Sequence, residues 1–443
     1  MSNFPQVIFA LVLVLAGFIL YKRIRFLRRN ILLGKATQRN DEVAKRWKTM
    51  LMVAFGQQKM FSKPVPALLH ALLYIGFLVI NLEVLEFILD GILGTHRLLA
   101  PYLGKAYVVA INVFEFLAFG VLISCVFLLF RRYVLRLARF TKPELKGWPR
   151  LDATLILLIE MVLMCAILTM NAADQVLARQ AVDPYLPLDT LVVSSQIQPF
   201  LQGWSTEALI GLERGAWWFH ILGILGFAVY VTYSKHLHIF LAFPATWYSN
   251  LRAKGEMQTM PEVTREVQVM LGINTGQEPA SNEVGRFGAK DINDLSWVNL
   301  LQAYACTECG RCTSECPANL TGKKLSPRKI MMDVRDRAEE VGKSLDAGGL
   351  GWEDGKSLLG DYISKEELNA CTSCNACVQA CPISLDPLAI ILEMRRYVAM
   401  EESGTPAQWN SMFQNMETSF SPWKFSPSDR FNWADKVKAE ENN

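Results

Sequence analysis

Two runs of cysteines carry a spacing that suits iron–sulfur chemistry. The first is Cys306-x-x-Cys309-x-x-Cys312-x-x-x-Cys316-Pro317, and the second is Cys371-x-x-Cys374-x-x-Cys377-x-x-x-Cys381-Pro382. In each run, the first three thiolates fit one tight turn around three corners of a [4Fe–4S] cube, and the fourth, followed by proline, ligates the other cluster. The spacing therefore predicts two crossed ligand sets: Cys306, Cys309, Cys312 and Cys381 for one cluster, and Cys371, Cys374, Cys377 and Cys316 for the other.

Two other uses of these cysteines fit less well. Paired C-x-x-C motifs also bind zinc, but a zinc site has no need of a third cysteine in step and a C-x-x-x-C-P ending in both runs. A disulfide framework disagrees with the reducing compartment that the topology below assigns to this part of the chain. The two remaining cysteines, Cys125 and Cys165, lie inside apolar stretches, where a small buried hydrophobic residue is the simpler interpretation.

The composition divides the chain into a membrane half and a soluble half. Of its 443 residues, 51% are hydrophobic, and the apolar residues concentrate before about residue 245. The formal net charge is only +3, and the basic residues cluster beside apolar spans, so they indicate membrane topology and not a nucleic-acid surface.

Five apolar stretches are long enough to cross a bilayer, at about residues 5–21, 66–90, 107–130, 152–172 and 215–241. The first is followed by basic residues, whereas a signal peptide carries its charge before the apolar run, so we expect a retained helix. The basic loop 131–150 faces the cytoplasm by the positive-inside rule. The N-terminus then lies outside, and everything after residue 242 is cytoplasmic, in a multi-pass protein of a bacterial inner membrane surrounded by lipid.

The expected fold is all-α, in four parts. Residues 1–242 form the five-helix membrane domain, and 243–296 form a linker with a short helix near 262–271. Residues 297–397 form an α-helical dicluster ferredoxin domain, with helices near 327–340 and 366–370. Residues 398–443 are polar but contain Trp409, Trp423 and Trp433, and we expect them to dock on a partner.

All five histidines lie in or beside the membrane half: His70, His96, His220, His236 and His238. Haem b needs two imidazoles from facing helices at one depth, and depth pairs His70 with His236 or His238. His220 precedes these two by 16 and 18 residues, or roughly 24–27 Å of helix. It would serve a second site near the outer face, for which only His96 is available. Alternatively, the histidines are polar bundle residues satisfied by hydrogen bonds, or His236 faces a lipid or quinone.

Four carboxylates also lie in the apolar stretches: Glu83, Glu86, Glu115 and Glu160. A carboxylate in a membrane is costly unless it is paired or neutral, so such residues often mark proton paths. We consider Glu86, Glu115 and Glu160 as a proton path for quinone chemistry. The simpler alternative is an interfacial position for Glu86 and a hydrogen-bonded, protonated carboxyl for the other two.

The stretch Trp297 to Arg328, together with Glu366 to Met400, resembles the membrane iron–sulfur oxidoreductases related to heterodisulfide reductase, which include electron transfer flavoprotein:menaquinone oxidoreductases. Their membrane part is similar to the nitrate reductase gamma subunit, a five-helix di-haem b protein. The resemblance implies His70, His220 and His238 as haem ligands and favours His238 over His236. Ile80 stands where that subunit has its other second-helix ligand.

The resemblance implies an electron-transfer subunit of a quinone oxidoreductase. Its cofactors would be two [4Fe–4S] clusters, one or two haem b groups, and menaquinone or ubiquinone. Many members of the family continue into a cysteine-rich CCG domain, for which this chain has no spare cysteine pair, so a separate CCG-domain subunit and an electron transfer flavoprotein are the implied partners. The alternatives are a membrane-anchored redox sensor or assembly scaffold and, less well supported, a transporter, which would need paired broken helices.

Overall fold

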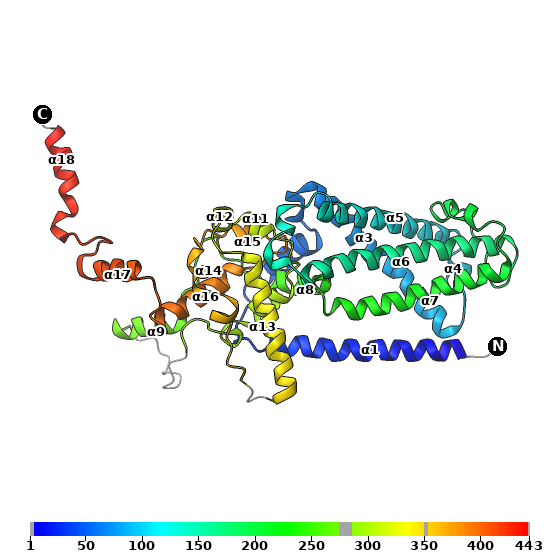
Figure 1. Ribbon diagram of the computed structural model, residues 1–443, viewed down its shortest axis with the longest axis horizontal. Helices are drawn as coiled ribbons and strands as arrows, with labels where there is room; N and C mark the ends of the chain where they lie inside the picture. Colours follow the sequence, from blue (N-terminus) through cyan, green and yellow to red (C-terminus); the bar gives the residue numbers. More distant parts are fainter. Residues whose placement is uncertain (1–3, 274–285, 350–352, 442–443) are drawn as a thin grey trace.

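The computed structural model describes residues 4–273, 286–349 and 353–441, and these residues form helices and connecting loops without a named strand. The all-α expectation is confirmed. Figure 1 shows an elongated molecule in which a bundle of long helices leads into a domain of short helices and then into a projecting tail.

Five helices are long and apolar enough to cross a membrane, as the sequence predicts. They are α1 (Phe4–Ile31), α3 (Pro64–Leu93), α5 (Lys105–Tyr133), α6 (Trp148–Arg179) and α7 (Thr206–Val231). Their outward faces expose large apolar side chains such as Leu11, Leu82 and Phe116. Lipid offers no hydrogen-bond partner to the backbone. Helices suit a membrane because they satisfy their internal backbone N–H and C=O groups within the segment.

The fifth membrane helix ends at Val231 and not near Leu241 as expected. A short 3₁₀ turn (Lys235–Leu237) and a separate helix, α8 (His238–Trp247), follow it. Asp152 of α6 stabilises the break, because it accepts hydrogen bonds from the Tyr230 hydroxyl at 2.5 Å, the Ser234 hydroxyl at 2.6 Å and the Lys235 amide at 3.1 Å. His236 and His238 therefore lie beyond the end of the membrane helix that carries His220.

The cluster domain is built from α10 (Trp297–Tyr304), α11 (Arg311–Ser314), α12 (Pro317–Leu320), α13 (Pro327–Gly348), α14 (Lys365–Ala370), α15 (Ala376–Ala380) and α16 (Pro387–Met400). Its core also includes Ala289, Ile292 and Leu295, so part of the predicted linker belongs to it. Gly288, at φ 69°, lies so close to α16 that a Cβ atom would come within 2.3 Å of the Tyr397 amide nitrogen. This contact requires glycine and fixes the segment against α16.

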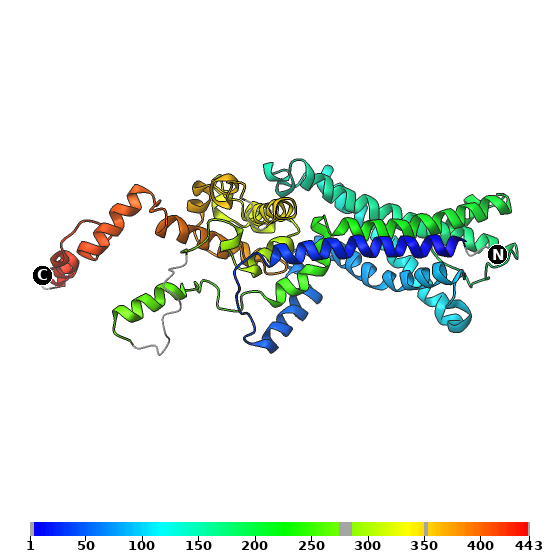
Figure 2. The ribbon, with the colours of Figure 1, turned by 90° about the horizontal axis from the view of Figure 1, so that it is seen from below.

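The first membrane helix joins the two halves. Figure 2 shows α1 running along the bundle and onto the cluster domain. Near its end, Arg23 pairs with Glu339 of α13 at 2.8 Å, and the Asn30 amide donates to the Tyr304 hydroxyl at 3.2 Å. A surface segment follows, with α2 (Val43–Thr49) and a π-helical turn (Met50–Phe55) that leads toward α3.

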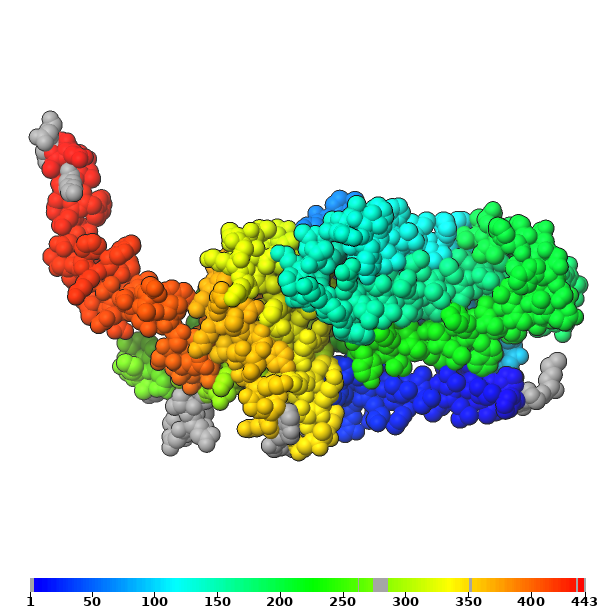
Figure 3. Space-filling view, in the orientation of Figure 1, coloured from blue at the N-terminus to red at the C-terminus, as the bar shows by residue number. Residues whose placement is uncertain are grey.

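The chain beyond α16 leaves the body of the molecule. It forms α17 (Ala407–Ser419) and α18 (Asn432–Glu441), and the space-filling view shows this tail projecting away from the cluster domain (Figure 3). Trp423 and Trp433 are 68% and 67% exposed, which is unusual for the residue type that buries the largest area. Another short helix, α9 (Pro261–Met270), lies in the predicted linker close to its expected position.

Candidate redox centres

The eight cysteines of the two runs line two neighbouring cavities in the cluster domain. Cys306, Cys309, Cys312 and Cys381 line the first, and Cys316, Cys371 and Cys374 line the second; Cys377 borders both. The fourth cysteine of each run thus lies at the cavity of the other run, as the crossed ligand sets require. Among the described residues, no group of three or more His, Cys, Asp or Glu side chains is gathered tightly enough for a single metal ion. The ligands of a cube stand further apart, at its corners.

The two runs share one backbone conformation. Glu308 and Ser373 occupy the same place in their runs and have φ of 56° and 55°, and Gly310 and Asn375 follow at 72° and 61°. Left-handed residues turn successive backbone N–H groups toward one centre, which is a typical way to surround an anionic group. Amide donors also reach sulfur: the Leu385 amide lies 3.3 Å from Cys381 Sγ. Such bonds tune cluster potentials.

The thiols are buried, and this has a chemical consequence. Burial, reinforced by neighbouring sulfurs, raises the pKa of Cys306 to about 12 and that of Cys381 to about 11. A thiolate in such a place needs a compensating cation, and iron supplies it when a cluster assembles and the protons leave. The donor set and its burial therefore fit iron–sulfur clusters.

His70 and His238 face each other across a cavity where the bundle meets the cluster domain. Their ring centroids are 6.3 Å apart, with 43° between the ring planes. His70 Nδ1 lies 3.1 Å from Gln57 Oε1, and His238 Nδ1 lies 3.1 Å from the Lys235 carbonyl oxygen. Such contacts leave the lone pair of each ring on Nε2, the usual arrangement of metal-binding histidines. Two imidazoles on opposite sides of one iron atom have centres about 6 Å apart, given metal–nitrogen bonds of about 2 Å.

The cavity that holds this pair extends to the first cysteine run. Its volume is about 330 Å³, its lining is mainly apolar, and it includes Cys309 and Pro382. Arg131, Arg132 and Arg139 also line it, and arginines are suited to the two carboxylates that haem carries. Imidazole geometry, apolar walls and arginines together fit haem b.

His236 lies next to this pair but engages another residue. Its Nε2 is 3.6 Å from Glu160 Oε1, and its ring packs on Phe227 with centroids 5.6 Å apart. Glu160 also lies 3.4 Å from Cys125 Sγ, the donor of that contact. Of the three carboxylates considered for a proton path, Glu160 is the one that lines the cavity of His70 and His238.

The other carboxylates belong to a buried polar network at the far end of the bundle. Glu86 accepts hydrogen bonds from the Tyr107 hydroxyl at 2.7 Å and the Leu99 amide at 2.8 Å. Glu115 accepts from two backbone amides, Val193 and Ser194, each at 3.1 Å. These bonds give both residues a structural role, while Glu83 keeps one buried oxygen without a partner in the described chain.

His96 belongs to the same network. Its Nδ1 accepts from Arg214 Nη2 at 3.1 Å, and its Nε2 lies 3.2 Å from Asp174 Oδ2. Because both ring nitrogens face charged partners, neither is free to bind iron in this arrangement. His220 differs: its Nδ1 lies 2.9 Å from the Leu163 carbonyl oxygen, and its buried Nε2 has no hydrogen-bond partner in the described residues.

Sequence reasoning missed the residues that connect the two centres. Lys235, whose carbonyl oxygen contacts His238, forms an ion pair through its side chain with Glu308, which lies between Cys306 and Cys309. Arg311 of the same run extends to the Met60 carbonyl at 3.3 Å, just before α3. Only their positions inside or beside the motifs could have drawn attention to them.

Arg328 ties the cluster domain to the loop between α5 and α6. Its buried guanidinium donates to the Arg139 carbonyl and to Glu144 Oε1, each at 2.7 Å. Burial would raise the pKa of Glu144, but the hydrogen bonds from Arg328 and Ser326 hold it below its usual value. The carboxylate is therefore charged, and the pair is an ion pair.

We expect Arg328→Met to destabilise the docked domains by about 3 kcal/mol, because removal of one partner leaves a charge buried at the junction. Thermal unfolding of the detergent-purified protein measures this. The matched control is Lys324→Met, which removes the exposed pair with Glu366 (71% and 63% exposed) and should leave the midpoint unchanged. Equal midpoints for both variants would contradict this role of Arg328.

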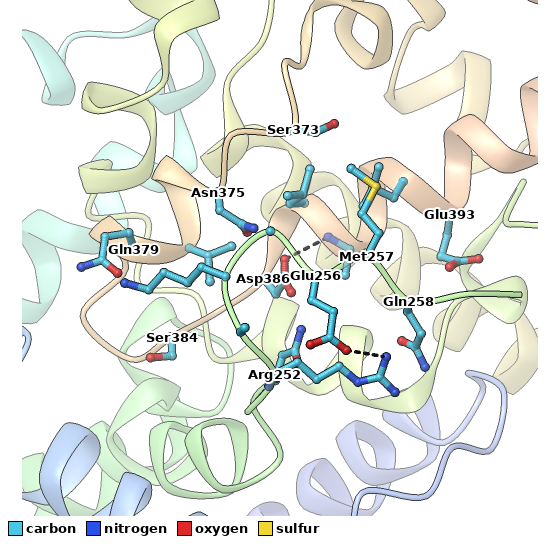
Figure 4. Close-up of a pocket in the computed structure, with 18 of the residues that line it drawn as sticks. Arg252, Glu256, Met257, Gln258, Ser373, Asn375, Gln379, Ser384, Asp386 and Glu393 are labelled. Atoms are coloured by element: carbon cyan, nitrogen blue, oxygen red, sulfur yellow. Dashed lines mark hydrogen bonds and ion pairs between the residues drawn. The ribbon is translucent and has the colours of Figure 1, made fainter.

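A surface hollow of about 200 Å³ lies beside the second cysteine run. Figure 4 shows Ser373 and Asn375 of that run on one side of it and the segment with Arg252 and Glu256 on another. Its charged lining residues comprise five cations and three anions: Arg39, Lys59, Arg252, Lys254, Arg396, Glu256, Asp386 and Glu393. Cys374 is exposed at this end of the domain.

Comparison with known proteins agrees with this geometry. Residues 305–385, which include all eight cysteines, match the 4Fe-4S dicluster domain. Over 436 residues the chain is 26% identical to the probable iron-sulfur-binding oxidoreductase FadF of Bacillus subtilis, a match that covers 92% of this chain and 57% of that protein.

Two further relatives support the same class. The chain is 28% identical over 431 residues to the EtfAB:quinone oxidoreductase of Syntrophomonas wolfei, covering 90% of this chain and 55% of that protein. A probable membrane-anchored ferredoxin of Chromohalobacter salexigens is 31% identical over 161 residues, which are 33% of this chain and 24% of that protein. No solved structure matches. The chain spans a little more than half the length of the first two relatives, both of which are oxidoreductases by name.

Proposed function

We propose that this chain is the electron-transfer unit of a membrane quinone oxidoreductase. Electrons would pass between a soluble donor, two [4Fe–4S] clusters, a haem b held by His70 and His238, and a quinone. One observation carries the proposal: a single cavity is lined by both facing histidines and by Cys309 of the first cysteine run. Two redox groups bound there would be neighbours.

The chain's own residues would have distinct tasks. The crossed cysteine sets would hold the clusters, and the haem would supply one-electron chemistry between them and the quinone. Gln57 and the Lys235 carbonyl would fix the ring orientations of His70 and His238 through their Nδ1 contacts. The positive-inside rule supports a cytoplasmic cluster domain in an inner membrane, since Arg131, Arg132 and the basic residues of the following loop lie at that end of the bundle.

A partner subunit would connect this chain to its soluble electron donor. The two long relatives extend well beyond the matched region, and one of them is named for electron transfer flavoprotein and quinone. We propose that a CCG-domain iron–sulfur subunit takes this place and passes electrons from an electron transfer flavoprotein. The hollow beside the exposed Cys374 is suited to this contact because it lies at the second cluster's surface, and the exposed tryptophans of the tail offer a docking arm.

The test is electron transfer in the purified full-length protein. Addition of a water-soluble menaquinol analogue should reduce the haem, which is seen as an α-band in difference spectra. Electron paramagnetic resonance signals of reduced clusters should then appear, to an extent set by the reduction potential of each cluster. A sensor or scaffold would hold its clusters but show no reduction by quinol. Absence of an α-band after dithionite treatment would refute the haem part of the proposal.

A further inference from the structure

A second, larger cavity lies between α1 and the rest of the bundle. Its volume is about 820 Å³. It is bordered by α1, α3, α6 and α7, with α8 and α10 at its cytoplasmic-side end, and its walls are mainly apolar; they include Ile24, Met164, Ile224, Phe227 and Phe240. Figure 2 shows α1 lying alongside the other long helices, and most of the residues that line the cavity belong to these helices.

His220 gives this cavity a specific polar group. The side chain lines the cavity and is 1% exposed. Its Nδ1 lies 2.9 Å from the Leu163 carbonyl oxygen, so in the neutral ring Nδ1 carries the proton and Nε2 carries the lone pair. That Nε2 is buried without a partner. Buried polar atoms are nearly always satisfied, so an orphan acceptor on a residue that lines a cavity points to a ligand that brings a donor or a metal.

The histidine inventory argues against a second bis-histidine haem at this position. The chain has five histidines. His70 and His238 face each other, His236 contacts Glu160, and His96 lies between Arg214 and Asp174. No second imidazole remains to face His220, and the α3 residues that line this cavity include no histidine.

We propose that this cavity binds the ring of a lipophilic quinone, whose quinol form donates a hydroxyl hydrogen bond to His220 Nε2. The proposal rests on the proposed function and names this cavity as the binding site of its quinone. A flat apolar ring matches the walls, and a hydroxyl group matches the single orphan acceptor. Glu160 lines both this cavity and the cavity of His70 and His238, so the two cavities are neighbours.

The test uses His220→Leu in the full-length protein, which removes the acceptor, with two readouts. Haem per chain should be unchanged, whereas reduction of the haem by a menaquinol analogue should slow by about tenfold, the usual effect of losing one buried hydrogen bond. Reduction by dithionite should be unaffected. Phe219→Leu is the control, because Phe219 neighbours His220 but is 53% exposed.

A second variant in the cavity and a titration with a quinone test the binding site independently of His220. Ile224→Phe, one helical turn after His220, narrows the cavity and retains the imidazole. It should weaken binding of a short-chain naphthoquinone, followed by quenching of tryptophan fluorescence. A fall in haem content to about half in His220→Leu would overturn the proposal in favour of a second haem. Unchanged quinol reduction and unchanged titration in both variants would also overturn it. If the wild-type protein held no haem, the proposed function would fail, and the naphthoquinone titration would still test whether the cavity binds a quinone.

Discussion

Replacing two cysteines of one crossed ligand set should cost no more iron than replacing either of them alone. Cys306→Ser and Cys381→Ser each remove a ligand from the same predicted cluster, so each single variant and the double variant should lose about four of about eight irons. Iron analysis of the purified protein measures this, and electron paramagnetic resonance of the reduced samples should show that the same cluster signal is lost in all three.

The complementary pair distinguishes crossed from uncrossed ligands. Cys371→Ser combined with Cys381→Ser takes one ligand from each crossed set, so this double variant should lose both clusters. Uncrossed sets would reverse the two results, because Cys371 and Cys381 would then serve one cluster. Cys165→Ser, on an exposed face of α6, is the control and should retain all iron.

Loss of either facing histidine should abolish the haem b spectrum. His70→Ala and His238→Ala each leave one imidazole where the geometry offers two, with ring centroids 6.3 Å apart. We expect the α-band near its wild-type height in His236→Ala, whose Nε2 faces Glu160, and its loss in the other two variants. Difference spectra of purified protein, normalised to acid-labile sulfide so that cluster content is constant, provide the measurement.

The Nδ1 contacts allow a finer variant. Gln57→Leu removes the acceptor that holds His70 but leaves the imidazole, so haem should remain bound with affinity lowered by about 10–100-fold. A haem titration of the apoprotein tests this. A full α-band in His70→Ala or His238→Ala would contradict the proposed ligands, whatever Gln57→Leu shows.

Much of this arrangement follows from local sequence. The cysteine spacing predicted the dicluster domain, because the motif itself specifies the loop conformation seen at Glu308 and Ser373. The five membrane helices followed from long apolar runs with basic flanks. Depth matching also placed His70 near His236 and His238, because basic residues mark the same end of each span.

Tertiary contacts decided what the sequence could not. The run from Tyr230 to Leu241 is apolar enough to continue a helix, but Asp152, distant in sequence, stabilises a turn at Ser234. The sequence offers His96 as a ligand for an outer haem site, whereas in the fold its two ring nitrogens face Arg214 and Asp174. Glu86 and Glu115 likewise depend on donors from loops that no periodicity predicts.

Lys235 has a mechanical consequence. Its backbone carbonyl contacts the ring of His238, and its side chain is paired with Glu308 inside the first cysteine run. A shift of the first cysteine run would therefore move the imidazole of His238 with it, and the distance between the cysteines and His238 would stay constant during domain motion. Because electron-tunnelling rates fall steeply with the distance between two redox groups, this ion pair would keep the electron-transfer rate steady during thermal motion.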